Sequence, residues 1–339
     1  MKTIHIIDSF KIGGVEVGAL NLLYENKDYS ILAVNGADNN FISSIPEECK
    51  NRITICSNYY QAIKFLKTSK PEIVVSSLWR AHLTSLLYKL ISTNIKRIHF
   101  THSARFAHFI DKLVSIVSVK NSTEIYSDSK RSFDWVNKYN NKNIKSRIIP
   151  MNISFSKEKR FFSPDELTFI YTGRLSKVKR IDLSILFIHE LTKLNMDPKF
   201  YIFGPDNGEL NNLKELIKKL KLQNNVYIHP SLHPLSVEKE LRKYNFYLQS
   251  SSAEGMSISV FQAIKNGLVP IVTPVGEISN YTEDNFNAIY INKDDISKTA
   301  EKFHTSFLQS FNNLSPGEIK NIEDYPPFSE NYFNNLNKI

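Results

Sequence analysis

Residues 254–277 read Glu254-Gly-Met-Ser-Ile-Ser-Val-Phe-Gln-Ala-Ile-Lys-Asn-Gly-Leu-Val-Pro-Ile-Val-Thr-Pro-Val-Gly-Glu277, and this stretch decides the fold. The preceding run Phe246–Ser251 predicts a buried strand, and Ser257–Gly267 predicts a short helix. A second buried strand is expected at Leu268–Thr273. Parallel α/β proteins bind ligands beside an acid that lies between a strand end and a helix N-terminus. The stretch therefore predicts a parallel sheet with a ligand site at its edge.

Short β-branched runs alternate with helix-length segments along almost the whole chain. In the first half, strands are expected at Thr3–Asp8, Tyr29–Asn35, Arg52–Cys56, Glu72–Leu78, Arg97–Thr101, Glu124–Ser127 and Arg147–Pro150. In the second half, they are expected at Thr168–Tyr171, Lys199–Phe203, Asn225–His229, Phe246–Gln249, Val269–Thr273 and Ala288–Ile291. Helices are expected between them, for example at Val15–Glu25, Ala81–Ser92 and Arg105–Ser118. Such repeats indicate parallel sheets covered on both faces.

The polar stretch Asn152–Asp165 interrupts this alternation and predicts a domain border. We therefore expect an α/β protein with two Rossmann-like domains, whose parallel sheets face a central cleft. The first domain is predicted at residues 1–155 and the second at residues 156–314. Residues 315–339 contain several aromatic side chains, so we expect this tail to pack back toward the first domain.

Composition narrows the functional classes. The 339 residues are 42% hydrophobic and 23% charged, which fits a globular protein with a sizeable core. The net charge of +9 suits an acidic ligand or an anionic membrane surface, although a plain Lys-rich surface would give the same value. No basic run is interleaved with aromatics, so no nucleic-acid partner is expected. The two cysteines lack metal-ligand spacing and fit a reducing compartment.

The start of the chain reads directly as a strand, and no apolar run approaches the roughly 20 residues of a membrane span. We therefore expect a cytoplasmic protein without a signal peptide. Its basic charge adds the expectation of peripheral contact with the anionic cytoplasmic face of the inner membrane.

The segment 173–182, Gly-Arg-Leu-Ser-Lys-Val-Lys-Arg-Ile-Asp, follows the first strand of the second predicted domain. It places Arg174 and Lys179 in a strand-to-helix loop. Cations beside a helix N-terminus form a site for a polyanion such as a diphosphate. An exposed basic turn is the structural alternative.

Glu254 and Gln262 are eight residues apart, in the loop before the predicted helix and on the helix itself. Both side chains are expected to face one pocket. A carboxylate and an amide suit a sugar diol, because each accepts a hydrogen bond from a hydroxyl and the amide also donates. Helix capping is the alternative role for Glu254.

Other candidates are weaker when taken alone. Gly13 and Gly14 occupy the first strand-to-helix turn, where a plain tight turn is an equally good explanation. His102 ends the fifth strand and could bond a ligand hydroxyl or serve as an acid or base, but a lone histidine is often structural. Gly204 follows another strand and could border a nucleotide.

Together these segments resemble the retaining glycosyltransferases of family 4, which have the two-Rossmann GT-B fold. The family's G-R-L-x-x-x-K-G segment resembles residues 173–179, followed by Arg180 where glycine is usual. Its E-x₇-E motif resembles Glu254 to Gln262, with an amide in place of the second acid. Residues 149–152 resemble its Pro-Asn-Gly segment without the glycine.

The resemblance also implies roles for individual residues. Arg174 and Lys179 would hold the donor diphosphate, Glu254 and His102 would lie at the donor sugar, and Gln262 would bind the ribose. The implied catalytic residues are Glu254, Arg174, Lys179 and His102. The implied donor-binding residues are Gly13, Gly14, Gly173, Gly204, Gly255, Met256, Ser257 and Gln262.

The resemblance implies transfer of a sugar, with retention, from a nucleotide diphosphate sugar to a hydroxyl of a glycan or lipid-linked acceptor. Assembly of bacterial surface polysaccharide such as O-antigen, capsule or lipopolysaccharide is the expected setting. No cofactor or metal is expected, and no Asp-x-Asp motif occurs. The alternatives are a nucleotide-sugar 2-epimerase or a phosphorylase of the same fold, and a non-catalytic bilobal sugar-binding protein. An NAD oxidoreductase is disfavoured because G-x-G-x-x-G is absent.

Overall fold

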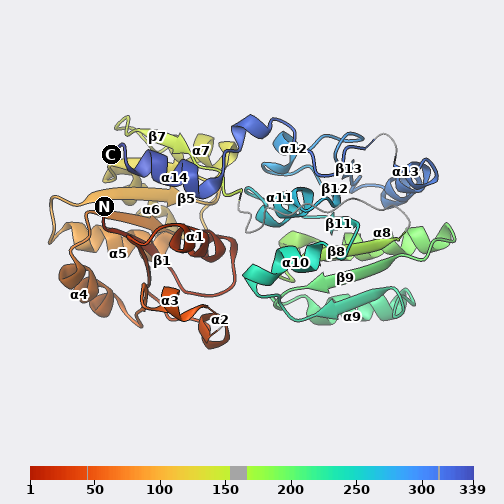
Figure 1. Cartoon of the computed structure of the whole chain (residues 1–339), viewed down its shortest axis with the longest axis horizontal. Coiled ribbons are helices and arrows are strands. Elements are labelled where there is room, and N and C mark those ends of the chain that lie inside the picture. Colours follow the sequence, from red (N-terminus) through yellow and green to blue (C-terminus); the bar gives the residue numbers. More distant parts are fainter. Residues whose placement is uncertain (44, 153–165, 312–313) are drawn as a thin grey trace. The chain divides into compact units, whose positions relative to one another are not determined.

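A computed structural model describes residues 1–43, 45–152, 166–311 and 314–339 of the chain. Contacts within the chain define two compact units (Figure 1). Unit 1 comprises Met1–Ile153 and Pro326–Ile339, and unit 2 comprises Ser154–Tyr325. The predicted border between residues 155 and 156 lies outside the described residues.

Unit 1 is built on a seven-stranded parallel sheet in the order β3-β2-β1-β4-β5-β6-β7. Its strands are β1 (Thr3–Ile7), β2 (Tyr29–Ala33), β3 (Ile53–Ile55), β4 (Ile73–Ser77), β5 (Lys96–Thr101), β6 (Glu124–Ser127) and β7 (Ser146–Ile148). Its helices are α1 (Gly14–Glu25), α2 (Asn39–Ser43), α3 (Glu47–Lys50), α4 (Tyr59–Ser69), α5 (Trp79–Lys89), α6 (Phe109–Lys120), α7 (Lys130–Asn137) and α14 (Phe328–Leu336). The central strands are buried on both faces, which explains their nearly continuous apolar sequences.

Unit 2 has a six-stranded parallel sheet in the order β10-β9-β8-β11-β12-β13. Its strands are β8 (Thr168–Thr172), β9 (Lys199–Phe203), β10 (Val226–His229), β11 (Phe246–Gln249), β12 (Val269–Val272) and β13 (Ile289–Tyr290). Its α-helices are α8 (Ile181–Lys193), α9 (Leu210–Lys219), α10 (Val237–Leu241), α11 (Ile258–Lys265), α12 (Ile278–Tyr281) and α13 (Ile296–Leu308). Short 3₁₀ turns are η1 (Lys177–Lys179), η2 (Pro234–Ser236) and η3 (Ile322–Asp324).

Both sheets reverse the direction of strand order at one place. The reversal lies between β1 and β4 in unit 1 and between β8 and β11 in unit 2. In open α/β sheets, ligands bind beside the carboxyl ends of the strands at such a reversal. The predicted class, α/β with two Rossmann-like parallel sheets, is confirmed.

Helix α6 begins later than the sequence predicts, at Phe109 rather than at Arg105. His108 is extended, with φ −161°, and its side chain accepts a hydrogen bond from the backbone N–H of Asp111. This side-chain cap fixes the first turn at Phe109, because it satisfies an N–H that has no partner within the helix.

The tail expected at residues 315–339 is divided between the two units. In unit 2, the Tyr325 hydroxyl donates to Glu277 at 3.1 Å. From Pro326 onward the chain belongs to unit 1, where α14 packs beside α1 (Figure 1). Tyr332 on α14 is fully buried, and its ring lies 6.1 Å from that of Tyr29.

Within the described ranges, no helix has both the length and the apolar character that crossing a bilayer requires.

Candidate functional site

The loops that follow β8 and β11 bring two predicted site residues together in unit 2. Lys179 ends the short turn η1, and Glu254 lies in the loop before α11. The Lys179 Nζ donates to Glu254 Oε1 at 2.7 Å, and both side chains are partly buried. The pair joins residues that are 75 positions apart, at the point where the strand order reverses. This is the place where the fold itself favours a ligand.

A buried glutamine that the sequence analysis missed holds the acid of this pair. The Gln249 Nε2 donates to Glu254 Oε1 at 3.1 Å and to Ser257 Oγ at 2.8 Å. Its own Oε1 accepts from the Tyr247 hydroxyl at 3.4 Å. Glu254 Oε1 therefore accepts from both Lys179 and Gln249, which leaves Oε2 as the oxygen that can accept from a ligand hydroxyl. The available signal was a polar residue at the end of an otherwise apolar strand.

The glycines at these strand ends are required by close backbone contacts. A Cβ on Gly204 would lie 1.8 Å from the carbonyl oxygen of Gly173, so no side chain fits there. Gly276 is similarly enclosed, because its Cβ would lie 2.3 Å from the Glu254 carbonyl oxygen. These contacts bring the loop after β9 against the loop after β8, and the loop after β12 against the loop after β11.

In the basic loop after β8, one of the two predicted diphosphate-binding side chains is exposed to solvent. Arg174 is exposed, and its carbonyl oxygen accepts from the Tyr171 hydroxyl at 3.1 Å. Arg180, at the position where the resembled family has glycine, has φ 46° and ψ 43°. This left-handed conformation explains the usual glycine, since a side chain there costs on the order of 1 kcal/mol. The Arg180 guanidinium pairs with Asp182 at 2.9 Å.

The turn into α11 is rigid. Ser257 is its N-cap, with φ 54°, and its hydroxyl is held by Gln249. The Tyr281 hydroxyl donates to the carbonyl oxygens of Met256 and Ser257 at 3.0 and 3.3 Å. Burial, followed by Glu254 and Tyr325, raises the pKa of Tyr281 well above its ordinary value, so this donor stays protonated. The predicted donor-binding segment Gly255–Ser257 thus has a fixed backbone beside Glu254.

Gln262 has a neighbour that the sequence analysis did not identify. Its Nε2 donates to Glu238 Oε1 on α10 at 3.5 Å, and both side chains are buried. This contact gives a physical reason for the amide at the position where the resembled family has an acid. A second carboxylate there would face that of Glu238 in a region with little water.

In unit 1, the first strand-to-helix turn contains the predicted Gly13 and Gly14. Gly13 is the N-cap of α1, and a Cβ on it would lie 2.5 Å from Glu16 Oε2. Near this turn, the Arg80 guanidinium donates to Asp8 at 3.0 Å and joins the first turn of α5 to the loop after β1. This ion pair marks the strand-order reversal of unit 1 and was not predicted.

His102 ends a buried chain of hydrogen bonds. Tyr29 contacts His5 Nδ1, the His5 Nε2 lies 2.7 Å from Ser77 Oγ, and Ser77 Oγ lies 2.8 Å from His102 Nε2. The His102 Nδ1 is 3.3 Å from Asp128 Oδ2.

One assignment of protons fits every hydrogen bond of this chain. The Asp128 carboxylate lies beside His102 Nδ1 and favours the tautomer with its proton there, so His102 Nε2 accepts from Ser77. Ser77 then accepts from His5 Nε2–H, and His5 Nδ1 accepts from Tyr29. Burial, aided by His102, lowers the pKa of His5 to about 3, which agrees with its neutral form here. The Nε2 of His102 is thus hydrogen-bonded to Ser77, and its Nδ1 lies beside Asp128, both in unit 1.

A second buried cluster lies beside this chain. His82 and His99 stack with ring centroids 3.8 Å apart. Burial is the main cause that lowers the pKa of His99 to about 3 and that of His82 well below its ordinary value. The Arg97 side chain is buried with them and donates to Ser85 Oγ at 2.8 Å.

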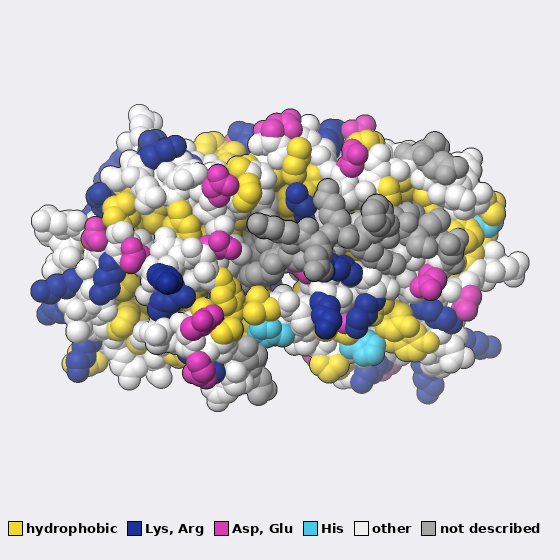
Figure 2. Space-filling model, viewed as in Figure 1, with side chains coloured by type: hydrophobic (Ala, Val, Ile, Leu, Met, Phe, Trp, Pro, Cys, Tyr) yellow, Lys and Arg dark blue, Asp and Glu magenta, His cyan; other side chains and the backbone are white. Residues whose placement is uncertain are grey.

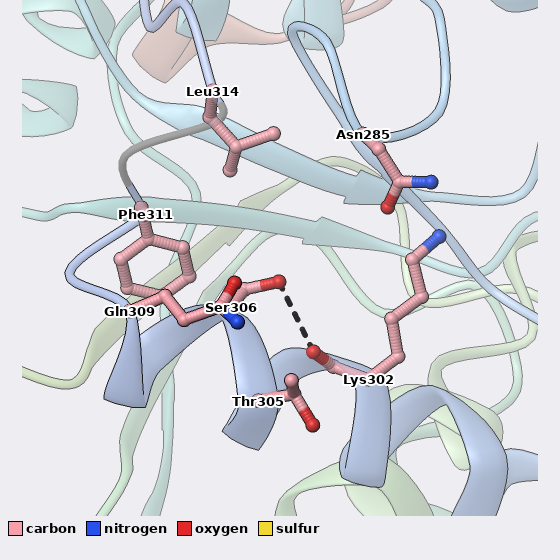
Figure 3. Close-up of a pocket in the computed structure, with 7 residues that line it drawn as sticks. All are labelled: Asn285, Lys302, Thr305, Ser306, Gln309, Phe311 and Leu314. Carbon is pink, nitrogen blue, oxygen red and sulfur yellow. Dashed lines mark hydrogen bonds between the residues drawn. The ribbon is translucent and has the colours of Figure 1, made fainter.

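A surface pocket lies elsewhere in unit 2 (Figure 3). It is lined by α13 and nearby loops, including Asn285, Lys302 and Phe311, and Ser306 Oγ donates to the Lys302 carbonyl oxygen beside it. None of the predicted site residues lines it. We therefore place the candidate site at the strand ends around Lys179 and Glu254, where the polar groups converge.

In the part of the chain that the structure describes, no group of three or more His, Cys, Asp or Glu residues could hold a metal ion. Metal independence stays a prediction.

Residues 152–310 match the family described as Glycosyl transferases group 1. A curated protein of Streptococcus agalactiae, the GtfA subunit of a UDP-N-acetylglucosamine–peptide N-acetylglucosaminyltransferase, is 29% identical over 199 residues. That alignment covers 58% of this chain and 38% of the relative. The GDP-mannose:cellobiosyl-diphosphopolyprenol alpha-mannosyltransferase of Xanthomonas oryzae is 22% identical over 43% of this chain and 39% of its own. The chain thus spans about two fifths of the length of these curated relatives.

Among solved structures, HepE of Anabaena in complex with UDP and glucose has a TM-score of 0.82. The identity is 12%, and the match covers 100% of both chains. At this identity the likeness shows the fold alone, and it confirms the predicted GT-B class.

Proposed function

We propose that this chain, whose residues 152–310 match the family described as Glycosyl transferases group 1, is a retaining glycosyltransferase that uses a nucleotide diphosphate sugar. The observation that carries the proposal is the Lys179–Glu254 pair, with its 2.7 Å contact, at the strand-order reversal of unit 2. A cation and an acid at this place suit the two ends of an activated sugar, because the diphosphate is anionic and the sugar offers hydroxyls.

The chemical difficulty is departure of the diphosphate as negative charge builds on its oxygens. Lys179 uses one of its three N–H groups on Glu254, so two remain for phosphate oxygens. Arg174 is exposed on the same loop and adds a second cation. Glu254 Oε2 would accept from a sugar hydroxyl and orient the ring. In this proposal the protein's cations and backbone N–H groups stabilise the leaving group without a metal.

Retention follows, in the proposal, from attack of the acceptor hydroxyl on the face from which the diphosphate leaves. The leaving phosphate oxygen takes the proton of the acceptor. We assign no protein nucleophile, and a role of His102 at the donor sugar stays an expectation of the family resemblance.

The proposed acceptor is a glycan or a lipid-linked glycan of a bacterial surface polysaccharide, handled at the cytoplasmic face of the membrane. One likeness supports it, because the Xanthomonas relative is named for transfer of mannose to a diphosphopolyprenol-linked glycan. The net charge of +9 agrees with work beside anionic lipid.

The test begins with a thermal-shift screen of nucleoside diphosphates and nucleotide sugars to identify the donor. Release of nucleoside diphosphate is then measured for wild type, Arg174→Ala and Lys179→Ala, with Lys177→Ala as control because Lys177 is exposed on the same loop. We expect a loss of about 10²–10³-fold for each of the first two variants and little change for the control. Turnover near wild type in both would refute the diphosphate role. Conversion of the donor sugar without acceptor would indicate an epimerase.

A further inference from the structure

Helix α6 of unit 1 is apolar on the side that faces water. Phe109, Ile110, Leu113 and Val117 are 72%, 55%, 50% and 47% exposed. At about 100° per residue these four side chains fall within an arc of about 100°. A surface helix ordinarily has the opposite arrangement, with its apolar stripe against the core.

The inner side of α6 explains why its large apolar side chains face water. Ser115, Ser118 and Val119 are its buried residues. The Ser118 Oγ lies 3.1 Å from His99 Nδ1 and accepts from Arg97 at 3.3 Å. Polar side chains thus occupy the inner side of α6, and its large apolar side chains are left on the outer side.

The neighbouring helix extends the apolar face. Leu90 and Ile91, at the end of α5, are 79% and 51% exposed. The Lys89 Nζ donates to the carbonyl oxygen of Asn121 at 3.2 Å, which places the C-terminal ends of α5 and α6 side by side. We call these six residues, Leu90, Ile91, Phe109, Ile110, Leu113 and Val117, the α6 face. Contiguous exposed apolar groups of this kind mark an interaction surface.

The charge around the α6 face identifies its partner. Residues 73–123 contain seven Lys or Arg and a single acid, a formal +6 of the chain's +9. Of these cations, Arg97 is buried and Arg80 pairs with Asp8. That acid, Asp111, is occupied within α6, where it accepts from the Ala107 N–H at 2.7 Å and from Ser115 Oγ at 2.9 Å. The view in Figure 2 shows Lys and Arg interspersed with Asp and Glu over the displayed face of the molecule. Within segment 73–123, basic residues outnumber acids by seven to one.

We propose that the α6 face docks unit 1 on a bilayer that contains anionic lipid. Phe109, Leu113 and their neighbours enter the boundary between headgroups and acyl chains, while Arg105, Lys112 and Lys120 meet lipid phosphates. Binding of this type adds apolar burial to electrostatic attraction. The inference rests on the proposed function and deepens it, because it locates the membrane contact on named residues.

The test is co-sedimentation of the full chain with vesicles of phosphatidylcholine, alone or mixed with phosphatidylglycerol. We expect binding to the mixed vesicles only, weakening as salt is raised. Phe109→Ser combined with Leu113→Ser should weaken binding at least tenfold. Leu308→Ser is the matched control, since Leu308 is 70% exposed on α13 of unit 2. Lys112→Gln and Lys120→Gln should each cost about fivefold.

Several results would overturn the inference. These are equal binding to both vesicle types, equal losses in the double variant and the control, or no vesicle binding at all. Concentration-dependent dimerisation that the double variant abolishes would assign the α6 face to a second copy of the chain instead. The sedimentation contains no nucleotide, and donor turnover is measured separately without vesicles. Failed docking with intact turnover therefore contradicts this inference alone, and lost turnover with intact docking contradicts the proposed function alone.

Discussion

Changing Gln262 to the acid that the resembled family carries should destabilise unit 2 in a pH-dependent way. Gln262→Glu would place a carboxylate oxygen about where Nε2 now lies, 3.5 Å from Glu238 Oε1. Two charges at that distance repel by about 5 kcal/mol at an effective dielectric constant of about 20. Protonating one of the two carboxyl groups costs less free energy than this repulsion. With an ordinary pKa near 4.3, it costs about 4 kcal/mol at pH 7 and about 1 kcal/mol at pH 5.

The direction of the pH dependence follows from the linkage between folding and proton binding. The pKa of one carboxyl is raised in the folded variant above its unfolded value, so the unfolded state releases a proton that the folded state keeps. The loss of stability is therefore small below the unfolded pKa and grows as pH rises toward the folded pKa. We expect the variant to be closest to wild type at pH 5 and clearly weaker at pH 7.

Hydrogen exchange of peptides that cover α10 and α11 measures this effect in unit 2. Both tryptophans, Trp79 and Trp135, lie in unit 1, so their fluorescence serves as an internal control for the other unit. The variant that exchanges the two groups, Glu238→Gln with Gln262→Glu, returns one acid and one amide to the pair and should recover most of the loss. Gln223→Glu, on an exposed turn, is the matched control. Equal protection of wild type and Gln262→Glu at both pH values would refute the reasoning.

Three further predictions concern both units. Gly204→Ala should cost unit 2 at least about 3 kcal/mol, because its Cβ would lie 1.8 Å from the Gly173 carbonyl oxygen; an unchanged Tm would show that the loop yields. The buried His5, His82 and His99 have lowered pKa values, so the folded state binds fewer protons than the unfolded state. The stability of unit 1 should therefore be fully present above pH 6.5 and fall as pH drops from 6.5 toward 3, by up to about 1.4 kcal/mol per pH unit for each histidine. Urea unfolding followed by tryptophan fluorescence at pH 7, 6 and 5 checks this, and a flat profile would contradict it. Donor turnover should survive exhaustive treatment with a chelator, whereas loss that Mg²⁺ or Mn²⁺ restores would contradict a metal-free site.

The sheets were predictable from sequence because local composition specifies them. A run such as Thr3–Ile7, buried at every position, reads as a strand whatever packs against it. The proximity of Lys179 and Glu254 could also be predicted, since both residues follow parallel strands whose carboxyl ends share one edge of the sheet. The support from Gln249 and the contact between Gln262 and Glu238 were not foreseeable, because they join elements whose spacing only tertiary packing sets.

Helix α6 shows a different limit. Its sequence has an apolar side and a serine side, and periodicity alone does not say which side faces the core. Ser118 faces inward, where it contacts the buried Arg97 and His99. The orientation of α6 therefore depends on polar groups contributed by the strand β5.

The path of the backbone has a practical consequence for engineering. The chain completes most of unit 1, forms all of Ser154–Tyr325, and then returns to unit 1 for its last helix. Ser154–Tyr325 is therefore an uninterrupted stretch that can be exchanged in a chimera by cutting at two junctions. Unit 1 is built from two separate stretches, so a chain truncated after Tyr325 lacks part of it. Such a truncation removes the buried Tyr332 from its aromatic neighbours Tyr29 and Tyr126.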